Sequence, residues 1–249
     1  MVEIDEQAEA NALVEISSTP LPIRKNVISE YDAEKLLHDT YAQLVPAAKE
    51  VCTFVEEQDL CWWDVNYNDE RTFNAYATSE NTIVVYHDIM AVSDTTDEVA
   101  MVLAHEMAHH IADHINEAKN RQAWGAFTGA LLVAAAVNSN GSYYCDYNCQ
   151  RNRQDAVNGA AQLGAAVGRI SFSKKQEKEA DMIAAYILAR SGYDVAQSRN
   201  LLLKMGAMST KKKTGFFDTH PAGPERLATY DQVIRDLLID PDRMPDKKK

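Results

Sequence analysis

The sequence predicts a mostly helical α+β fold, with one small β-sheet beside a buried helix. Several long segments carry apolar residues at helical spacing, whereas two short runs of β-branched and aromatic residues lie between positions 61 and 86. Apolar residues make up 46% of the 249 positions, which is enough for a sizeable core. The sequence has no convincing internal repeat, so we do not expect a repeat architecture.

The expected elements follow from these patterns in chain order. A helix is predicted from Tyr31 to Glu57, kinked or interrupted near Pro46 because proline lacks a backbone N–H. Two strands, at Cys61–Tyr67 and Thr82–Tyr86, are expected to form the small sheet. The remaining expected elements are helices near residues 97–116, 122–138, 152–169, 174–191, 194–206 and 222–238.

Three parts of the chain differ in composition. Residues 1–28 contain a Ser-Ser-Thr-Pro-Leu-Pro stretch and are expected to form an extended lead-in. Residues 29–240 hold the periodic segments and are expected to form the main domain. Residues 241–249, rich in proline, aspartate and lysine, are expected to be a disordered tail.

One helical segment contains the motif H-E-x-x-H, formed by His105, Glu106 and His109. On a helix the two histidines lie one turn apart on one face, about 5–6 Å between Cβ atoms. Both imidazoles can then bind one tetrahedral Zn²⁺, while the Glu106 carboxylate reaches a metal-bound water rather than the metal. The pattern is typical of zinc-dependent peptide hydrolases. The alternative is a core helix that carries two incidental histidines.

A third ligand must come from elsewhere in the chain. The metzincin pattern needs a glycine and a further histidine at positions that Ala112 and Ile115 occupy here, so that class is excluded. His110 and His114 are also one turn apart, but Ile111 stands where that pair would need a glutamate. We interpret this pair as a neighbouring polar face, structural or solvated, with an auxiliary role as the alternative.

A second helical segment carries Glu177, Glu179 and Asp181. Glu177 and Asp181 are four residues apart and share a face, whereas Glu179 points elsewhere. A carboxylate ligand with an acid one turn later suits zinc chemistry, because the second acid accepts the free ring N–H of a ligating histidine and fixes its tautomer. The alternative interpretation is an ordinary charged helix surface.

The H-E-x-x-H motif, followed by the string E-x-E-A-D from Glu177 to Asp181, resembles a family of gluzincin zinc metallopeptidases, the HtpX-type and CAAX-prenyl-endopeptidase-type enzymes. The resemblance implies a zincin-like domain with one Zn²⁺ per chain. It implies that His105, His109 and Glu177 bind the metal and that Asp181 is the outer hydrogen-bond partner.

The resemblance covers about residues 60–235 and includes a possible substrate-binding segment. Asn74, Ala75, Tyr76 and Ala77 resemble the N-A-F-A segment of the family, which precedes an edge strand matched by Thr82–Tyr86. The membrane-spanning helices of the integral members are missing. The chain is therefore more similar to soluble, exported bacterial members, and CAAX-prenyl processing itself is not expected.

His220 lies in a Thr-His-Pro sequence similar to the segment that opens the last helix of the family. Three roles remain open for this residue. It can donate a hydrogen bond to a developing oxyanion, occupy the fourth zinc position and keep the site latent, or support the turn at Pro221 as a structural residue.

The expected activity is hydrolysis of internal peptide bonds. Glu106 takes a proton from the metal-bound water and later passes it to the leaving amine. Backbone pairing of an extended substrate with the edge strand suits unfolded or damaged proteins. The alternatives are a latent or non-catalytic chaperone-like protein that uses zinc structurally, and a non-peptidase zinc hydrolase.

The net charge of −12 disfavours nucleic-acid binding, since the basic clusters are short and lack interleaved aromatic residues. No segment reaches 18 consecutive apolar residues, the usual length of a membrane-spanning helix. Residues 123–168 contain two stretches rich in glycine and alanine. We expect them to form a buried helical hairpin, with a peripheral membrane contact as the alternative.

The cysteines form two local pairs, Cys52 with Cys61 and Cys145 with Cys149. Two such pairs favour disulfides and an oxidising compartment, with four free thiols in a cytoplasmic protein as the alternative. The first residues are acidic and polar, unlike a secretory signal peptide. A mature periplasmic or otherwise extracytoplasmic protein is the preferred interpretation.

Overall fold

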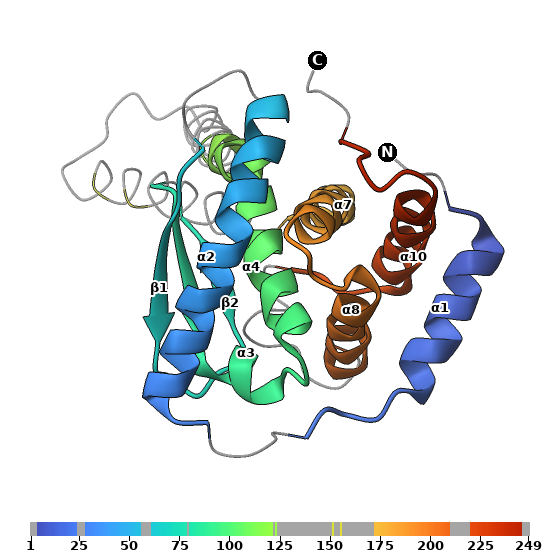
Figure 1. Ribbon diagram of the computed structural model, residues 1–249, viewed down its shortest axis with the longest axis horizontal. Helices are drawn as coiled ribbons and strands as arrows, with labels where there is room; N and C mark the ends of the chain where they lie inside the picture. The colour runs from blue at the N-terminus through green and yellow to red at the C-terminus, as the bar shows by residue number, and fades with distance from the viewer. Residues whose placement is uncertain are drawn as a thin grey trace. The chain divides into compact units, whose positions relative to one another are not determined.

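The computed structural model describes residues 4–23, 28–55, 61–78, 80–121, 123, 151, 155, 172–209 and 220–245. The chain forms two compact units, one comprising Met1–His114 with Phe172–Lys249 and the other Ile115–Ser171. All elements named below belong to the first unit (Figure 1). They confirm the predicted fold class, which is mostly helical with one small sheet.

The sheet has three strands in the order β1-β3-β2. β1 (Asp64–Asn68) runs parallel to β3 (Thr82–Tyr86), and β2 (Ala75–Ala77) runs antiparallel to it. The expectation that Thr82–Tyr86 forms a sheet edge was therefore wrong. The segment before it forms β2 and folds back through a turn that includes Asn81 at φ 55°, a conformation that asparagine tolerates, and so covers the second side of β3.

Helices make up most of the rest of this unit. The main ones are α1 (Glu6–Ser18), α2 (Glu30–Val55), α3 (His87–Val92), α4 (Thr96–Ile111), α7 (Lys174–Arg190), α8 (Val195–Ser209) and α10 (Pro224–Ile239). Pro46 lies inside the continuous helix α2, so of the two expected effects of this proline the interruption does not occur.

Helix α4 is the centre of the unit. The Thr95 side chain caps its start by accepting a hydrogen bond from the backbone N–H of Glu98. Every residue from Glu98 to His109 is buried, because α2, α7, α8 and β2 all pack against the helix (Figure 1). A helix without a solvent-exposed face places any polar residue that it carries in the interior.

The beginnings of α7 and α10 are defined by local sequence. Ser173 and Gln176 form a capping box, in which each side chain binds the backbone of the other residue. Pro224 occupies the first turn of α10, directly after Gly223. These two starts place Glu177 in the first turn of α7 and His220 just before α10.

The N-terminal segment differs from its expected extended conformation, because residues 6–18 form helix α1. This helix buries Ala12 and Ile16 against α8 and α10. A Cβ atom at Gly206 of α8 would lie 2.9 Å from the Ile16 side chain, so the glycine permits this close approach. Because α1 is short, it is stabilised by its packing against α8 and α10 rather than by its own helix propensity.

The C-terminal tail also differs in part from its expected disorder. The Arg190 side chain at the end of α7 donates hydrogen bonds to the backbone carbonyls of Asp242 and Arg243, which hold the first residues of the tail. Residues 246–249 lie outside the described part of the chain.

Cys52 and Cys61 are joined by a disulfide that links the end of α2 to the segment before β1. Cys145, Cys149 and nearly all of the expected hairpin at 123–168 lie outside the described residues. Within the described residues, no helix combines the length and the hydropathy that crossing a membrane requires.

Candidate metal centre

Helix α4 presents the two histidines of the H-E-x-x-H motif to one point in the interior. The Nε2 atoms of His105 and His109 lie 3.1 Å apart, and both side chains are buried. Burial lowers the pKa of His109 well below its ordinary value, which favours the neutral imidazole that a metal ion requires.

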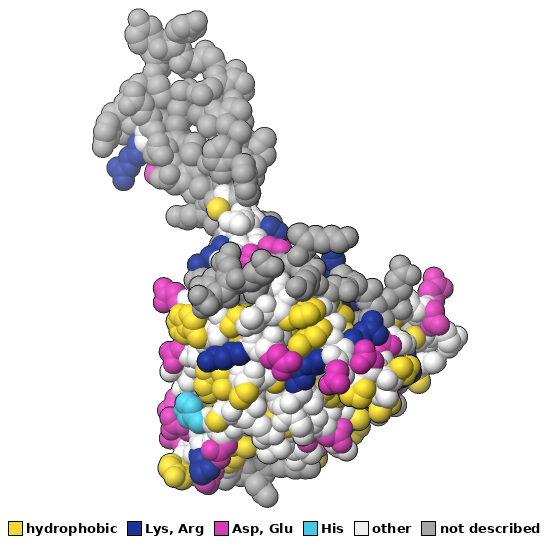
Figure 2. Space-filling view, turned by 45° about the horizontal axis from the view of Figure 1, so that its top comes forward, with side chains coloured by type: hydrophobic (Ala, Val, Ile, Leu, Met, Phe, Trp, Pro, Cys, Tyr) yellow, Lys and Arg dark blue, Asp and Glu magenta, His cyan; other side chains and the backbone are white. Residues whose placement is uncertain are grey.

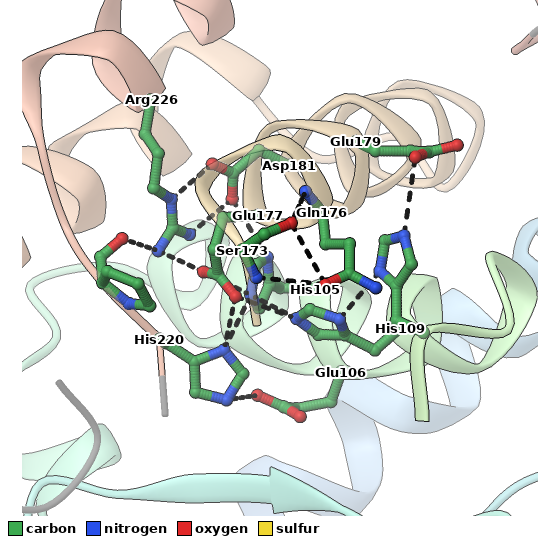
Figure 3. A network of polar contacts seen from close by, with 12 residues as sticks. His105, Glu106, His109, Ser173, Gln176, Glu177, Glu179, Asp181, His220 and Arg226 are labelled. Carbon is green, nitrogen blue, oxygen red and sulfur yellow. Dashed lines mark hydrogen bonds and ion pairs between the residues drawn. The ribbon is translucent and has the colours of Figure 1, made fainter. Parts of the chain in front are cut away.

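Two further groups approach the same point from other elements. Glu177 of α7 places its Oε1 atom 3.4 Å from the Nε2 atom of His109. His220, just before α10, places its Nδ1 atom 3.1 Å from Glu177 Oε1 and 3.3 Å from His105 Nε2. Segments far apart in the sequence thus converge on one buried cluster (Figure 3).

The separations within this cluster are short enough for its four side chains to bind one metal ion. One ligand atom from each of His105, His109, Glu177 and His220 lies within 4.8 Å of all the others. Tetrahedral zinc with bonds of about 2.0–2.1 Å places its ligand atoms about 3.3 Å apart. The separations of 3.1–3.4 Å are close to that value. Lone pairs this close repel one another unless protons or a cation lie between them, so the residues fit a zinc ion.

Glu106 lies beside this cluster and outside it. Both oxygens of its carboxylate are buried without a hydrogen-bond partner among the described residues. Its nearest polar neighbour is His220, whose Nε2 atom lies 3.5 Å from Glu106 Oε1. Burial raises the pKa of the Glu106 carboxyl, although the neighbouring histidines oppose this rise. A carboxylate with a raised pKa is a stronger base, as a proton acceptor at the site must be.

Asp181 occupies the outer position expected for it. Its Oδ1 atom lies 3.0 Å from the Nδ1 atom of His105, on the side of that ring away from the cluster. This contact, at an ion-pair distance, favours the ring proton on Nδ1 and so leaves the Nε2 lone pair for a metal.

Arg226 of α10 completes the site, and the sequence analysis assigned it no role. Its guanidinium binds both oxygens of Asp181 at 2.7 Å and contacts Glu177 Oε2 at 2.5 Å. Burial alone would raise the pKa of Asp181 and of Glu177, but the Arg226 charge together with the neighbouring histidines outweighs it, so both pKa values lie below the usual range. Both carboxylates therefore remain ionised.

The expected polar face formed by His110 and His114 is absent, because α4 ends at Ile111 instead of continuing to position 116. Asp113 has φ 58°, which reverses the chain after α4. His114 is consequently buried, with its Nδ1 atom 3.0 Å from the Nδ1 atom of His109. His110 instead places its Nε2 atom 2.6 Å from the backbone carbonyl of Thr78, directly after β2.

Two further contacts, one made by His114 and one made by His109, were also unexpected. The Nε2 atom of His114 lies 3.5 Å from Oε2 of Glu179, a residue expected to point elsewhere (Figure 3). Phe172, just before α7, stacks on the His109 ring with centroids 3.8 Å apart and an interplanar angle of 20°. His109 is therefore held on its outer edge and on one face.

The segment predicted to bind substrate lies at a sheet edge next to α4. Asn74 and Thr78 bond to β3 through their backbone groups, and the register pairs Tyr76 with Val84. In an antiparallel ladder the alternate residues point their N–H and C=O groups to the other side. Those residues are Ala75 and Ala77, and no other described strand pairs with that side of β2.

Comparison with known proteins agrees with this geometry. The profile of Peptidase family M48 matches residues 38–234. The chain belongs to peptidase family M48. The prediction of a zinc metallopeptidase is thus confirmed at the level of the family, and the group formed by His105, His109, Glu177 and His220 is one that can hold a metal ion.

Individual M48 relatives include enzymes from bacteria and mitochondria. The chain is 28% identical over 179 residues to mitochondrial metalloendopeptidase OMA1 of Arabidopsis thaliana, covering 71% of this chain and 33% of that protein. It is 30% identical over 169 residues to the beta-barrel assembly-enhancing protease of Escherichia coli K12, covering 65% and 32%. The chain thus spans about a third of the length of these relatives.

Proposed function

We propose that this M48 protein is a zinc-dependent endopeptidase that binds one Zn²⁺ through His105, His109 and Glu177. The observation that carries this proposal is the compact cluster of buried ligand atoms, with the buried carboxylate of Glu106 beside it. A purely structural zinc site needs no adjacent base. The free carboxylate therefore favours a hydrolase over a chaperone-like protein with structural zinc.

The residues around the cluster have distinct tasks in this proposal. When bound, zinc makes a water molecule acidic near neutral pH and polarises the scissile carbonyl. Glu106 accepts the proton of that water and delivers it to the leaving amine. Asp181 and Arg226 orient His105 and keep Glu177 ionised, as the contacts at 2.5–3.0 Å indicate.

We further propose that His220 keeps the resting site closed. Its Nδ1 atom belongs to the ligand cluster, which gives the site four protein ligands. Catalytic zinc sites keep one position open, whereas sites with four protein ligands are closed. Of the roles considered for His220, this geometry favours the blocking one, and activity then requires the ring to move away.

The edge of β2 favours an extended peptide as the substrate. The outward N–H and C=O groups of Ala75 and Ala77 offer backbone pairing to an added strand, and β2 packs against the metal-binding helix. Such pairing recognises the backbone of the substrate more than its side chains. Unfolded or damaged proteins, whose backbones are accessible, are therefore the proposed substrates.

We also propose an extracytoplasmic location, which the described disulfide supports. Disulfides persist in oxidising compartments, and Cys52 is bonded to Cys61. The bacterial relative named for beta-barrel assembly suggests periplasmic protein quality control as the setting. A cytoplasmic protein with reduced thiols is the alternative.

The first experiment compares the zinc-loaded protein with its Glu106→Gln variant on casein, with bound zinc measured in both. Equal zinc, cleavage by the parent and a loss of about 10²–10⁴-fold in the variant would support the proposal. Zinc without cleavage, even after His220→Ala, would favour the chaperone-like alternative. A protein that binds no stoichiometric zinc would overturn the metal assignment.

A further inference from the structure

The two metal-facing histidines are supported in different ways. His105 contacts a carboxylate directly, because its Nδ1 atom lies 3.0 Å from Asp181. His109 instead faces a third imidazole, since its Nδ1 atom lies 3.0 Å from the Nδ1 atom of His114. A carboxylate follows only beyond that ring, with Glu179 Oε2 lying 3.5 Å from His114 Nε2.

The ring nitrogen that His109 presents to the cluster determines which nitrogen of each ring carries the proton, and therefore which partner donates in each contact. His109 presents Nε2 to the cluster, so a metal-binding lone pair there requires the ring proton on Nδ1. That proton can only be donated to the Nδ1 lone pair of His114. His114 must then carry its own proton on Nε2, where the Glu179 carboxylate, which only accepts, faces it.

We propose that His114 and Glu179 are positioning residues for the metal ligand His109, acting as a chain of polar contacts that fixes its tautomer and ring orientation. This inference rests on the proposed zinc site and extends it to two residues outside the ligand set. Outer partners of metal-binding histidines typically change metal affinity by about 10–100-fold.

A merely structural role makes the opposite prediction for suitable substitutions. His114 is buried, and its ring packs near Phe172, with centroids 6.2 Å apart. His114→Phe keeps an aromatic ring of similar size but removes the acceptor. His114→Asn keeps a short side chain whose oxygen can replace Nδ1 as acceptor, but it leaves a cavity. If His114 has only a packing role, the phenylalanine variant should resemble the parent more closely than the asparagine variant does. If His114 positions His109, the asparagine variant should bind zinc more tightly than the phenylalanine variant.

The test measures the zinc dissociation constant of the full chain by competition with a chromogenic chelator, alongside the melting temperature of the metal-free protein. We expect His114→Phe to weaken zinc binding about 10–100-fold while melting near the parent. We expect His114→Asn to stay within about threefold of the parent affinity although it melts lower, because its acceptor is retained. His38→Phe, on an exposed part of α2, is the control and should change neither quantity.

A second pair keeps the inference testable if a His114 variant does not fold. Glu179 is 34% exposed, so its replacement disturbs packing little. Glu179→Gln retains an acceptor and should bind zinc like the parent, whereas Glu179→Leu should bind it more weakly. Parent-like affinity in both His114→Phe and Glu179→Leu would overturn the inference, as would equal losses in the phenylalanine and asparagine variants. Zinc binding by the parent without casein cleavage would contradict only the proposed function.

Discussion

The Nε2 atom of His220 lies 3.5 Å from Glu106 Oε1, while its Nδ1 atom lies 3.1 Å from Glu177 Oε1. One imidazole therefore contacts both the candidate base and a candidate metal ligand. A water molecule and a scissile carbonyl need the space between these same groups. In the proposed mechanism, the ring of His220 and a productive substrate therefore exclude each other.

Replacing His220 should relieve this exclusion. We expect His220→Ala to raise kcat/KM for an unfolded substrate about tenfold or more, because the competent state no longer competes with a closed one. Initial rates at equal zinc occupancy measure the effect, with Glu106→Gln/His220→Ala as the inactive control. A fall in activity would instead assign His220 to transition-state stabilisation.

Removing the buried cation should destabilise the fold. Arg226→Met removes the cation that Glu177 and Asp181 share and leaves both buried carboxyl groups with histidine contacts alone, which we expect to lower the free energy of unfolding by about 3–5 kcal/mol. Urea unfolding of the metal-free protein measures this loss. Adding Asp181→Asn should restore part of it, since one uncompensated charge disappears. A double variant whose losses simply add would show that the two residues are not coupled.

The edge of β2 predicts an alternating dependence on the substrate backbone. Ala75 and Ala77 point their N–H and C=O groups outward, whereas the backbone of Tyr76 faces β3. In peptides methylated at single backbone nitrogens, KM should rise about tenfold when the methyl group faces β2 and change little at the next position. A uniform response along the peptide would argue against strand addition.

Acidification should weaken the attachment of α1. Arg199 donates hydrogen bonds to Glu15 and, from α8, also contacts Asp231 of α10. The hydrogen bond from Arg199 lowers the pKa of Glu15. Its contribution is therefore complete above the unfolded-state pKa of about 4.3 and is lost as the pH falls through the lower folded-state value.

Glu15→Gln tests this pH dependence. Because the Glu15 side chain is 44% exposed, solvent screening limits the loss to about 0.5–1 kcal/mol at pH 7. The difference in melting temperature between parent and variant should begin to shrink at about pH 4.3 and disappear only below the lowered folded-state pKa of Glu15. Glu34→Gln, in an exposed pair on α2, serves as the control. A difference that persists at low pH would mean that Glu15 acts through packing.

Helical spacing was sufficient to predict the residues that share a helix. His105 and His109 lie one turn apart on α4, and Glu177 and Asp181 lie one turn apart on α7, so each pair was found from local sequence. His220 has no such local signal, because its segment meets α4 and α7 only through tertiary packing. The family resemblance supplied it.

The contacts around these ligands depended on features that spacing does not contain. His114 faces His109 only because α4 ends before Asp113, whose positive φ redirects the chain. Arg226 left one signal in the sequence that was not used. Two acidic residues on one buried helix face require a nearby cation, and the segment after His220 carries an arginine at position 226.

His114 and Phe172, which both contact the His109 ring, are the residues at which the chain leaves and re-enters the first compact unit. Any partner whose binding moves either of these two side chains therefore also changes the environment of His109. Thermodynamic reciprocity then requires zinc to alter the affinity for that partner by the same factor by which the partner alters the affinity for zinc.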